Sequence, residues 1–226
     1  GDKEFIVYGK RRITYSEFLA GVNSTSNALM AEGVGRGDRV AVLAQNCPEW
    51  CTTFWATVDI GAVLVGLNGW WNTDEILYGL EDSGAKVLVV DRKRFERIAG
   101  DVDGIDTLER VYLIDALPEE VAAGGTPSAK LRPFSELVAA PTSEFPDVPI
   151  DEGDPAVIFY TSGTTGRPKG AISTHRSMIA NIQNTVFLLT ATGAYQAALA
   201  EQTGEEAPAT PGGQHVSLFT SPLFHV

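Results

Sequence analysis

Residues 39–68 read RVAVLAQNCPEWCTTFWATVDIGAVLVGLN and predict a strand, a helix and a second strand. The first part, residues 39–44, is a near-continuous apolar run, typical of a strand that is buried on both faces. Pro48 suits the first turn of a helix. Apolar residues then recur at helical spacing: Trp50, Phe54, Trp55 and Val58. Residues 62–68 form the second apolar run, and such a strand–helix–strand unit is the building block of a parallel sheet.

The same alternation continues on both sides of this stretch. Upstream, Thr14 and Glu17 have the spacing of a capping box and predict the start of a helix. Downstream, Asn72 and Glu75 predict the start of another helix. Further strands are expected at three apolar runs: residues 86–91, 111–115 and 156–160. The expected fold class is therefore α/β, a mostly parallel sheet flanked by helices, with a β-rich region near residue 160.

Prolines divide the chain into sections. Seven of the twelve lie within residues 118–155, so this stretch is expected to be a surface connector with at most one short helix, at residues 134–138. We therefore expect a β/α lobe, a Pro-rich connector and a second lobe, at residues 1–117, 118–154 and 155–226. The second lobe is expected to hold a helix, a flexible loop and a strand that runs into a turn, at residues 178–189, 203–214 and 215–226.

Composition narrows the function classes. The 226 residues are 44% apolar and 20% charged, a globular balance that excludes wholesale disorder. A net charge of −12 repels phosphate backbones, so a nucleic acid is not expected as the partner. No apolar run reaches the length of a membrane span, and residues 177–200, although uncharged, are too polar for lipid. The chain begins without a methionine or a signal peptide, and we expect a piece of a longer protein that is cytoplasmic or peripheral to a membrane.

Cysteines and histidines do not predict a transition-metal site. Cys47 and Cys51 lie four residues apart at the start of a predicted helix, and we expect two reduced core thiols there rather than a shared site. The three histidines have no metal-ligand spacing: His175, His215 and His225.

Residues 160–170, YTSGTTGRPKG, carry the chemistry. Glycines let the backbone turn its N–H groups toward an anion, hydroxyls add donors without charge, and a lysine neutralises phosphate oxygens. A Walker A loop is disfavoured, because Pro168 precedes Lys169 and Gly170 follows it. The alternative from residue types alone is a glycine-rich hairpin that only joins two strands.

This segment resembles the phosphate-binding motif of the adenylate-forming enzymes, which include acyl-CoA synthetases, luciferases and the adenylation domains of peptide synthetases. Other segments resemble motifs of that family in the family's order: ITYSEFL at 13–19, GDRVAVLAQNCPEW at 37–50, IGAVLVGLN at 60–68 and SPLFHV at 221–226. The resemblance covers essentially the whole chain. The phosphate motif is highly specific, whereas the flanking motifs support the resemblance in combination.

The resemblance implies part of the large N-terminal domain of an ATP-dependent carboxylic acid–CoA ligase, with a fatty acid as the expected substrate. In such enzymes a carboxylate attacks the α-phosphorus of ATP, pyrophosphate leaves, and a thiol then takes the acyl group. The implied cofactors and co-substrates are ATP, Mg²⁺ and coenzyme A, and the implied partner is a small carboxylic acid. Two alternatives within the enzyme class are an aryl-acid CoA ligase and an adenylation domain that loads a carrier protein. An alternative of another class is an ATP-binding module without catalysis.

The resemblance also implies roles for individual residues. Six would cradle the β- and γ-phosphates: Ser162, Gly163, Thr164, Thr165, Gly166 and Lys169. Thr161 would help to hold the metal, and Lys169 and His225 are the expected catalytic residues. His225 would line or gate the path between the adenylate and the thiol, and the alternative is a hydrogen-bonded histidine at the end of a strand. The pair Trp70 and Trp71 is expected to pack or to lie in an exposed loop, far from the phosphate segment.

The resemblance further implies what is missing. The adenine-binding and ribose-binding segments of the family, an acidic metal ligand and the C-terminal domain with its lysine would all follow Val226. We therefore expect that this chain alone binds ATP weakly and does not turn over. About twenty residues within 190–214 exceed the family's usual link, and they are expected to lengthen a helix and add a loop, or to be neutral surface.

Overall fold

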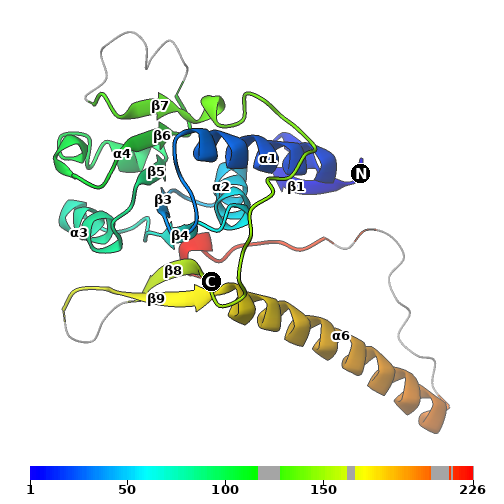
Figure 1. The fold of residues 1–226 in the computed structure, drawn as a ribbon. Helices are drawn as coiled ribbons and strands as arrows, with labels where there is room; N and C mark the ends of the chain where they lie inside the picture. Colours follow the sequence, from blue (N-terminus) through cyan, green and yellow to red (C-terminus); the bar gives the residue numbers. More distant parts are fainter. Residues whose placement is uncertain (117–127, 162–165, 205–213, 215, 226) are drawn as a thin grey trace.

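The computed structural model describes residues 1–116, 128–161, 166–204, 214 and 216–225. Within these residues, seven strands form one sheet in the order β7-β6-β5-β3-β4-β8-β9 (Figure 1). In sheet order the strands are β7 (Leu131–Pro133), β6 (Arg110–Leu113), β5 (Val87–Val90), β3 (Arg39–Leu43), β4 (Val63–Gly66), β8 (Pro155–Thr161) and β9 (Lys169–Thr174). All neighbours pair in parallel except β8 and β9, which are antiparallel. The predicted α/β class and the predicted strands in residues 39–160 are confirmed.

Helices cover both faces of this sheet. They are α1 (Tyr15–Ala31), α2 (Pro48–Asp59), α3 (Thr73–Ser83), α4 (Arg92–Phe95) and α6 (His175–Thr203), with 3₁₀ turns η1 (Val102–Gly104), η2 (Phe134–Glu136) and η3 (Leu223–His225). Both predicted capping boxes are present, Thr14 with Glu17 and Asn72 with Glu75. Pro48 opens α2 as predicted.

Alternate residues of the central strands enter two separate cores. Val40 and Val42 of β3 pack with α1 and α2, whereas Ala41 and Leu43 pack with α3 and α4. Figure 1 shows the corresponding arrangement, with α1 and α2 on one side of the sheet and α3 and α4 on the other. This is why residues 39–44 are almost continuously apolar: a parallel strand that is buried on both faces has no solvated side.

The N-terminal hairpin was not predicted from the sequence. It consists of β1 (Glu4–Tyr8) and β2 (Arg11–Thr14), which pair antiparallel in a separate two-stranded sheet. Phe5 anchors it on α1, with its ring 4.6 Å from that of Tyr15 and 4.8 Å from that of Phe18. Because the residues of these strands are mostly exposed, the hairpin lacks the apolar alternation that reveals a buried strand.

Part of the proline-rich stretch packs into the fold instead of running over the surface as a connector. Leu131 and Phe134 are buried in β7 and η2, and the Ser24 hydroxyl donates to the Leu137 carbonyl over 2.9 Å. The single short helix expected near residue 134 is observed as η2. One sheet collects strands from all three of the sections into which prolines divide the chain.

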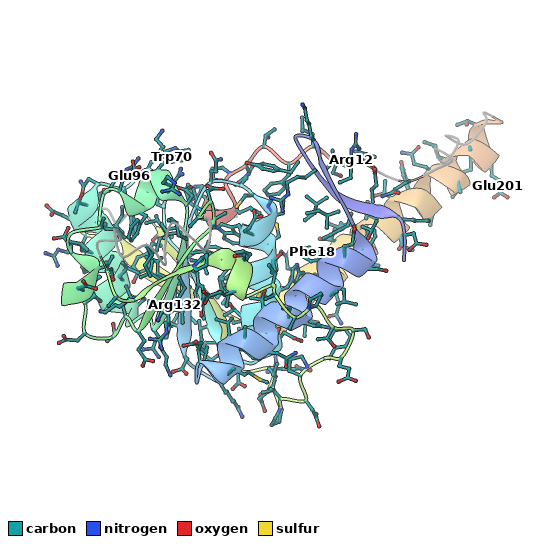
Figure 2. The ribbon with its side chains drawn as sticks, turned by 90° about the horizontal axis from the view of Figure 1, so that it is seen from above. Arg12, Phe18, Trp70, Glu96, Arg132 and Glu201 are labelled. Atoms are coloured by element: carbon teal, nitrogen blue, oxygen red, sulfur yellow. The ribbon has the colours of Figure 1, made fainter. Side chains whose placement is uncertain are left out.

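The C-terminal part agrees with one expectation and contradicts another. Helix α6 continues to Thr203, so the extra residues lengthen the helix by about four turns, which is one of the two expected outcomes, and α6 has no buried residue. Figure 2 shows α6 projecting from the body, with Glu201 near its far end. The strand predicted within residues 215–226 is wrong for the residues described there, which form no strand and end in η3. The flexible loop predicted at 203–214 lies largely outside the described residues.

Within the described residues, no helix is both long enough and apolar enough to cross a membrane.

Asp91 ties the ends of two central strands together, and its removal is expected to be costly. Its carboxylate accepts from the Gln45 backbone N–H over 3.0 Å and pairs with the buried Arg94 guanidinium at 2.5 Å. Asp91→Ala would leave that cation unpaired and should lower the free energy of unfolding by roughly 3 kcal/mol. Thermal unfolding of the natural full-length polypeptide that carries this sequence tests this, with the exposed Asp106→Ala as the control. Equal melting temperatures for the two variants would contradict the role of Asp91.

Candidate active site

Residues 160–170, here called the phosphate segment, connect two paired strands at one edge of the sheet. Strand β8 ends at Thr161, β9 begins at Lys169, and these two residues face each other in the register. The hairpin that was the alternative to a phosphate-binding loop is therefore observed. It does not exclude phosphate binding, because the tip of a hairpin can also bind an anion. The loop follows the carboxyl end of β8, which runs parallel to β4, and ligands of open α/β sheets bind beyond such strand ends.

The described ends of the segment offer a hydroxyl, a cation and a glycine turn. The Thr161 hydroxyl donates to the Lys169 carbonyl over 3.3 Å, and both residues are exposed. Gly166 has a φ of +121°, which favours glycine. The structure thus brings Thr161, Gly166 and Lys169 together. The other four predicted cradle residues lie outside the described residues: Ser162, Gly163, Thr164 and Thr165.

Gly170 allows the two strands to pair beside the loop. A Cβ there would lie 2.8 Å from Cγ2 of Ile158, closer than real side chains approach. The last glycine of the motif is therefore explained by strand packing, and it has no need of a ligand role.

The predicted distance between the tryptophan pair and the phosphate segment is wrong. Trp71 is buried, and its ring meets that of Tyr160 edge-on at 5.4 Å, directly before Thr161. Trp70 is 71% exposed and meets the ring of Phe224 edge-on at 5.3 Å. The prediction that this pair packs or lies exposed is confirmed, with one tryptophan in each state. Long-range pairing of β4 with β8, which sequence spacing does not reveal, brings the pair to the segment.

His225 lies in η3, and the described residues directly before it, 216–222, form no strand. Asn46 fixes this segment, because its side chain donates to the Ser221 carbonyl over 2.8 Å and accepts from the Leu223 backbone N–H over 2.9 Å. Asn46 follows β3, so η3 is held at the ends of the strands. Asn46 was not predicted from the sequence, although its position between a buried strand and a helix N-terminus was an available signal.

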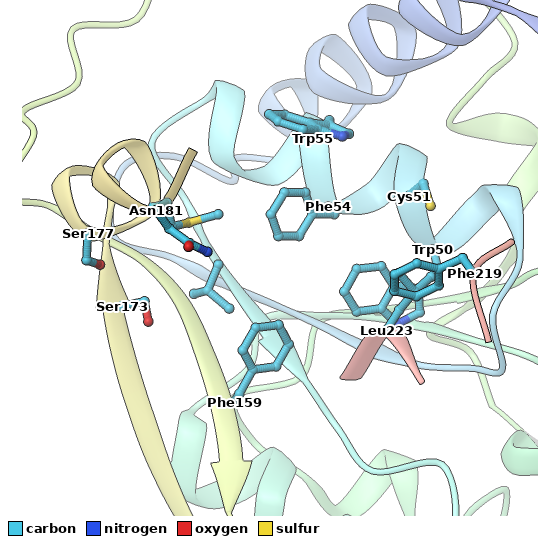
Figure 3. Close-up of a pocket in the computed structure, with 12 residues that line it drawn as sticks. Trp50, Cys51, Phe54, Trp55, Phe159, Ser173, Ser177, Asn181, Phe219 and Leu223 are labelled. Atoms are coloured by element: carbon cyan, nitrogen blue, oxygen red, sulfur yellow. The ribbon is translucent and has the colours of Figure 1, made fainter. Parts of the chain in front are cut away.

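An apolar cavity of about 450 Å³ lies beside these strand ends (Figure 3). Its walls come from α2, β8, β9, the start of α6 and the C-terminal segment. The lining residues are Trp50, Cys51, Phe54, Trp55, Val157, Phe159, Ser173, Ser177, Met178, Asn181, Phe219 and Leu223. Val157 and Phe159 alternate along β8 with Thr161 as the next residue on the same face. The cavity therefore lies on the face of β8 that leads to the phosphate segment.

One polar donor in the cavity wall has no partner. The indole nitrogen of Trp50 is buried and lacks a hydrogen-bond partner among the described residues, while the ring stacks with Phe54 at 5.9 Å. A buried donor without a partner is costly to the folded state.

The two cysteines behave as the predicted core thiols. Neither forms a disulfide, and both are half-buried. Burial raises the pKa of Cys47 to about 12 and that of Cys51 to about 11. Both are therefore protonated thiols at neutral pH. In the part of the chain that the structure describes, no group of three or more histidine, cysteine, aspartate or glutamate residues could hold a metal ion.

The chain belongs to a known family. Its sequence matches the model of the AMP-binding enzymes over residues 1–226, so it is a member of the adenylate-forming enzymes. The resemblance on which the sequence analysis relies is confirmed.

Three relatives illustrate the range of the family. The chain is 34% identical to 4-coumarate–CoA ligase 2 of Oryza sativa subsp. japonica, over 96% of this chain and 36% of the relative. It is 32% identical to the long-chain-fatty-acid–CoA ligase FadD13 of Mycobacterium tuberculosis, over 74% of this chain and 30% of the relative. The structure of the anthranilate CoA ligase AuaEII with anthranoyl-AMP superimposes with a TM-score of 0.69 at 27% identity, over 77% of this chain and 32% of that chain. The chain spans about a third of the length of the curated relatives it matches.

The raised thiol pKa values predict slow alkylation. At pH 8 a thiol of pKa about 11 reacts roughly a hundredfold more slowly than an ordinary cysteine, because little thiolate is present. Mass spectrometry of peptides with Cys47 and Cys51 after iodoacetamide treatment should show this in the folded full-length polypeptide. The rate should rise about tenfold for each pH unit between 8 and 10, because the thiolate fraction does so. Labelling at the same rate in buffer and in urea would contradict the burial of these thiols.

Proposed function

We propose that the polypeptide carrying this chain is an ATP-dependent, AMP-forming carboxylic acid–CoA ligase. The observation that supports this most is the position of the phosphate segment directly beyond Phe159, which lines the apolar cavity. An acid whose apolar part occupied the cavity would present its carboxylate toward the strand end. The reaction needs a carboxylate and a triphosphate in that arrangement.

In this proposal the loop residues bind the triphosphate of ATP. Six residues donate to or neutralise the β- and γ-phosphate oxygens: Ser162, Gly163, Thr164, Thr165, Gly166 and Lys169. The carboxylate oxygen forms a bond to the α-phosphorus while the bond from that phosphorus to the pyrophosphate oxygen breaks. The Lys169 ammonium stabilises the negative charge that develops on the leaving pyrophosphate. The thiol of coenzyme A then attacks the acyl carbon and AMP leaves.

Magnesium fits this site as an ion carried largely by the nucleotide. Mg²⁺ keeps several waters and is commonly bound by one or two protein oxygens plus phosphates. The exposed Thr161 hydroxyl at the end of β8 suits one such ligand, and the described residues offer no carboxylate cluster that would hold the ion alone. When bound, the ion would withdraw charge from the phosphate oxygens.

A fatty acid is the first candidate substrate, because the cavity is lined mainly by apolar side chains. An aryl acid is the second candidate, and the wall of the cavity favours it. Phe54 lies between two tryptophans, stacked with Trp50 and edge-on to Trp55 at 5.3 Å, and such a group of rings suits an aromatic ligand.

His225 is proposed to lie between the cavity and the thiol. Leu223, two residues earlier, lines the cavity, and η3 is held at the strand ends by Asn46. An exposed imidazole at that position can line the path by which a thiol reaches the acyl carbon.

Carboxylate-dependent exchange of pyrophosphate into ATP tests the proposed function. The natural full-length polypeptide would be given short, medium and long fatty acids beside benzoate and cinnamate. Exchange that increases with alkyl chain length would support the fatty-acid assignment, and exchange confined to the aromatic acids would support the second candidate. A folded protein that binds ATP but shows no exchange with any acid would favour the non-catalytic module instead.

Lys169→Ala should lower the exchange rate by roughly 10²- to 10³-fold, because a positive charge aimed at the leaving group is lost. Because Lys169 is exposed, the melting temperature of the variant should be close to that of the wild type. The control is Lys93→Ala, which removes an exposed lysine from α4. Retained exchange with a collapsed melting temperature would return the segment to the role of a structural hairpin.

A further inference from the structure

Helix α3 contacts the phosphate segment on the side that leads into the loop. Tyr160, the residue before Thr161, is only 6% exposed, and its hydroxyl donates to Oδ2 of Asp82 over 2.7 Å. The Gly79 carbonyl lies 3.4 Å from the same hydroxyl and is a weaker second acceptor. Asp82 and Gly79 both belong to α3.

Two glycines make this approach possible. A Cβ on Gly79 would lie 2.8 Å from Cζ3 of Trp71 and 2.9 Å from Cδ2 of Leu67, so only glycine allows that indole to lie against α3. Gly170 faces Tyr160 across the hairpin. The phenol ring of Tyr160 is thus confined by α3, by Trp71 and by the opposite strand.

The same helix contacts the segment where the chain leaves the loop. The Arg167 guanidinium lies 4.8 Å above the centre of the Tyr78 ring, two residues before Lys169. The Tyr78 hydroxyl donates to Oδ1 of Asp82 over 3.2 Å. One carboxylate therefore accepts from two tyrosine hydroxyls, one in the loop's entering arm and one beneath its leaving arm.

Helix stability does not explain the position of Asp82. It lies in the last turn of α3, where the helix dipole disfavours a negative charge, and that turn holds no basic residue. The two hydroxyl donors are the partners that stabilise the carboxylate there.

We propose that Tyr78 and Asp82 are positioning residues for MgATP, which hold the two arms of the phosphate segment at a fixed separation. This proposal rests on the proposed function. When both arms are fixed, less conformational entropy is lost on binding the triphosphate. The position of Lys169, the first residue of β9, is then fixed as well. In this proposal both residues act through the segment and not by contact with the nucleotide.

Pyrophosphate-exchange kinetics of the natural full-length polypeptide test the proposal. Asp82→Ala and Tyr160→Phe should each raise the KM for MgATP by about tenfold, while the KM for the acid changes less than about twofold. The KM for MgATP of the double variant should be no higher than that of the more impaired single variant, because Asp82 and Tyr160 act through one shared hydrogen bond. The control is Glu81→Ala, which removes the neighbouring carboxylate of the same helix, and its KM for MgATP should equal that of the wild type.

Wild-type KM values for MgATP in both variants would overturn the proposal. If Asp82→Ala does not fold, Tyr78→Leu removes the half-buried ring and hydroxyl beneath Arg167, and it should raise the same KM by several-fold. If the wild type itself shows no pyrophosphate exchange, the proposed function fails, and amide hydrogen–deuterium exchange of residues 159–170 then tests the positioning role. Faster amide exchange in Asp82→Ala than in Glu81→Ala would support that role, and equal amide protection in the two variants would refute it.

Discussion

The parallel pairing of β8 with β4 is the contact on which the site depends. It joins Leu64, Val65 and Gly66 to Val157, Ile158 and Phe159, and so continues the central sheet into the hairpin that carries the phosphate segment. Gly66 makes the pairing possible, because a Cβ there would lie 2.6 Å from Cε1 of Phe159. Any larger residue would displace the Phe159 ring, which lines the cavity. A single close approach thereby fixes both a wall of the cavity and the position of β8, which leads into the phosphate segment.

The remaining parts of the site gather around that joint. Trp71 follows β4 and packs on Tyr160 of β8, so the loop after β4 supports the strand that enters the phosphate segment. The C-terminal segment reaches the same place through Asn46, which holds Leu223 beside the cavity. The apolar cavity and the described ends of the phosphate segment thus adjoin through backbone geometry. The proposed reaction, which joins a carboxylate to the α-phosphorus of ATP, requires such proximity.

Local signals in the sequence were sufficient for most of the sheet. The apolar runs and the capping residues Thr14 and Asn72 have short-range causes, and the predicted elements begin at those residues. The cavity could not be predicted, because Trp50, Phe159 and Phe219 come from three distant segments that meet only in the folded chain. For the same reason the proximity of Trp71 to the phosphate segment was missed. The family motif predicted which residues would bind phosphate, but the α3 residues that support its arms carry no local signature.

The most direct test of the central claim follows an oxygen atom. The full-length polypeptide would convert a carboxylic acid labelled with ¹⁸O in its carboxylate, in the presence of ATP and coenzyme A, and the released AMP and pyrophosphate would be analysed by mass spectrometry. If the carboxylate attacks the α-phosphorus, one labelled oxygen bridges acid and phosphate in the adenylate and leaves with AMP. We therefore expect ¹⁸O in AMP and none in pyrophosphate. Thioester formation with unlabelled AMP, or with label in any other phosphate product, would contradict the account.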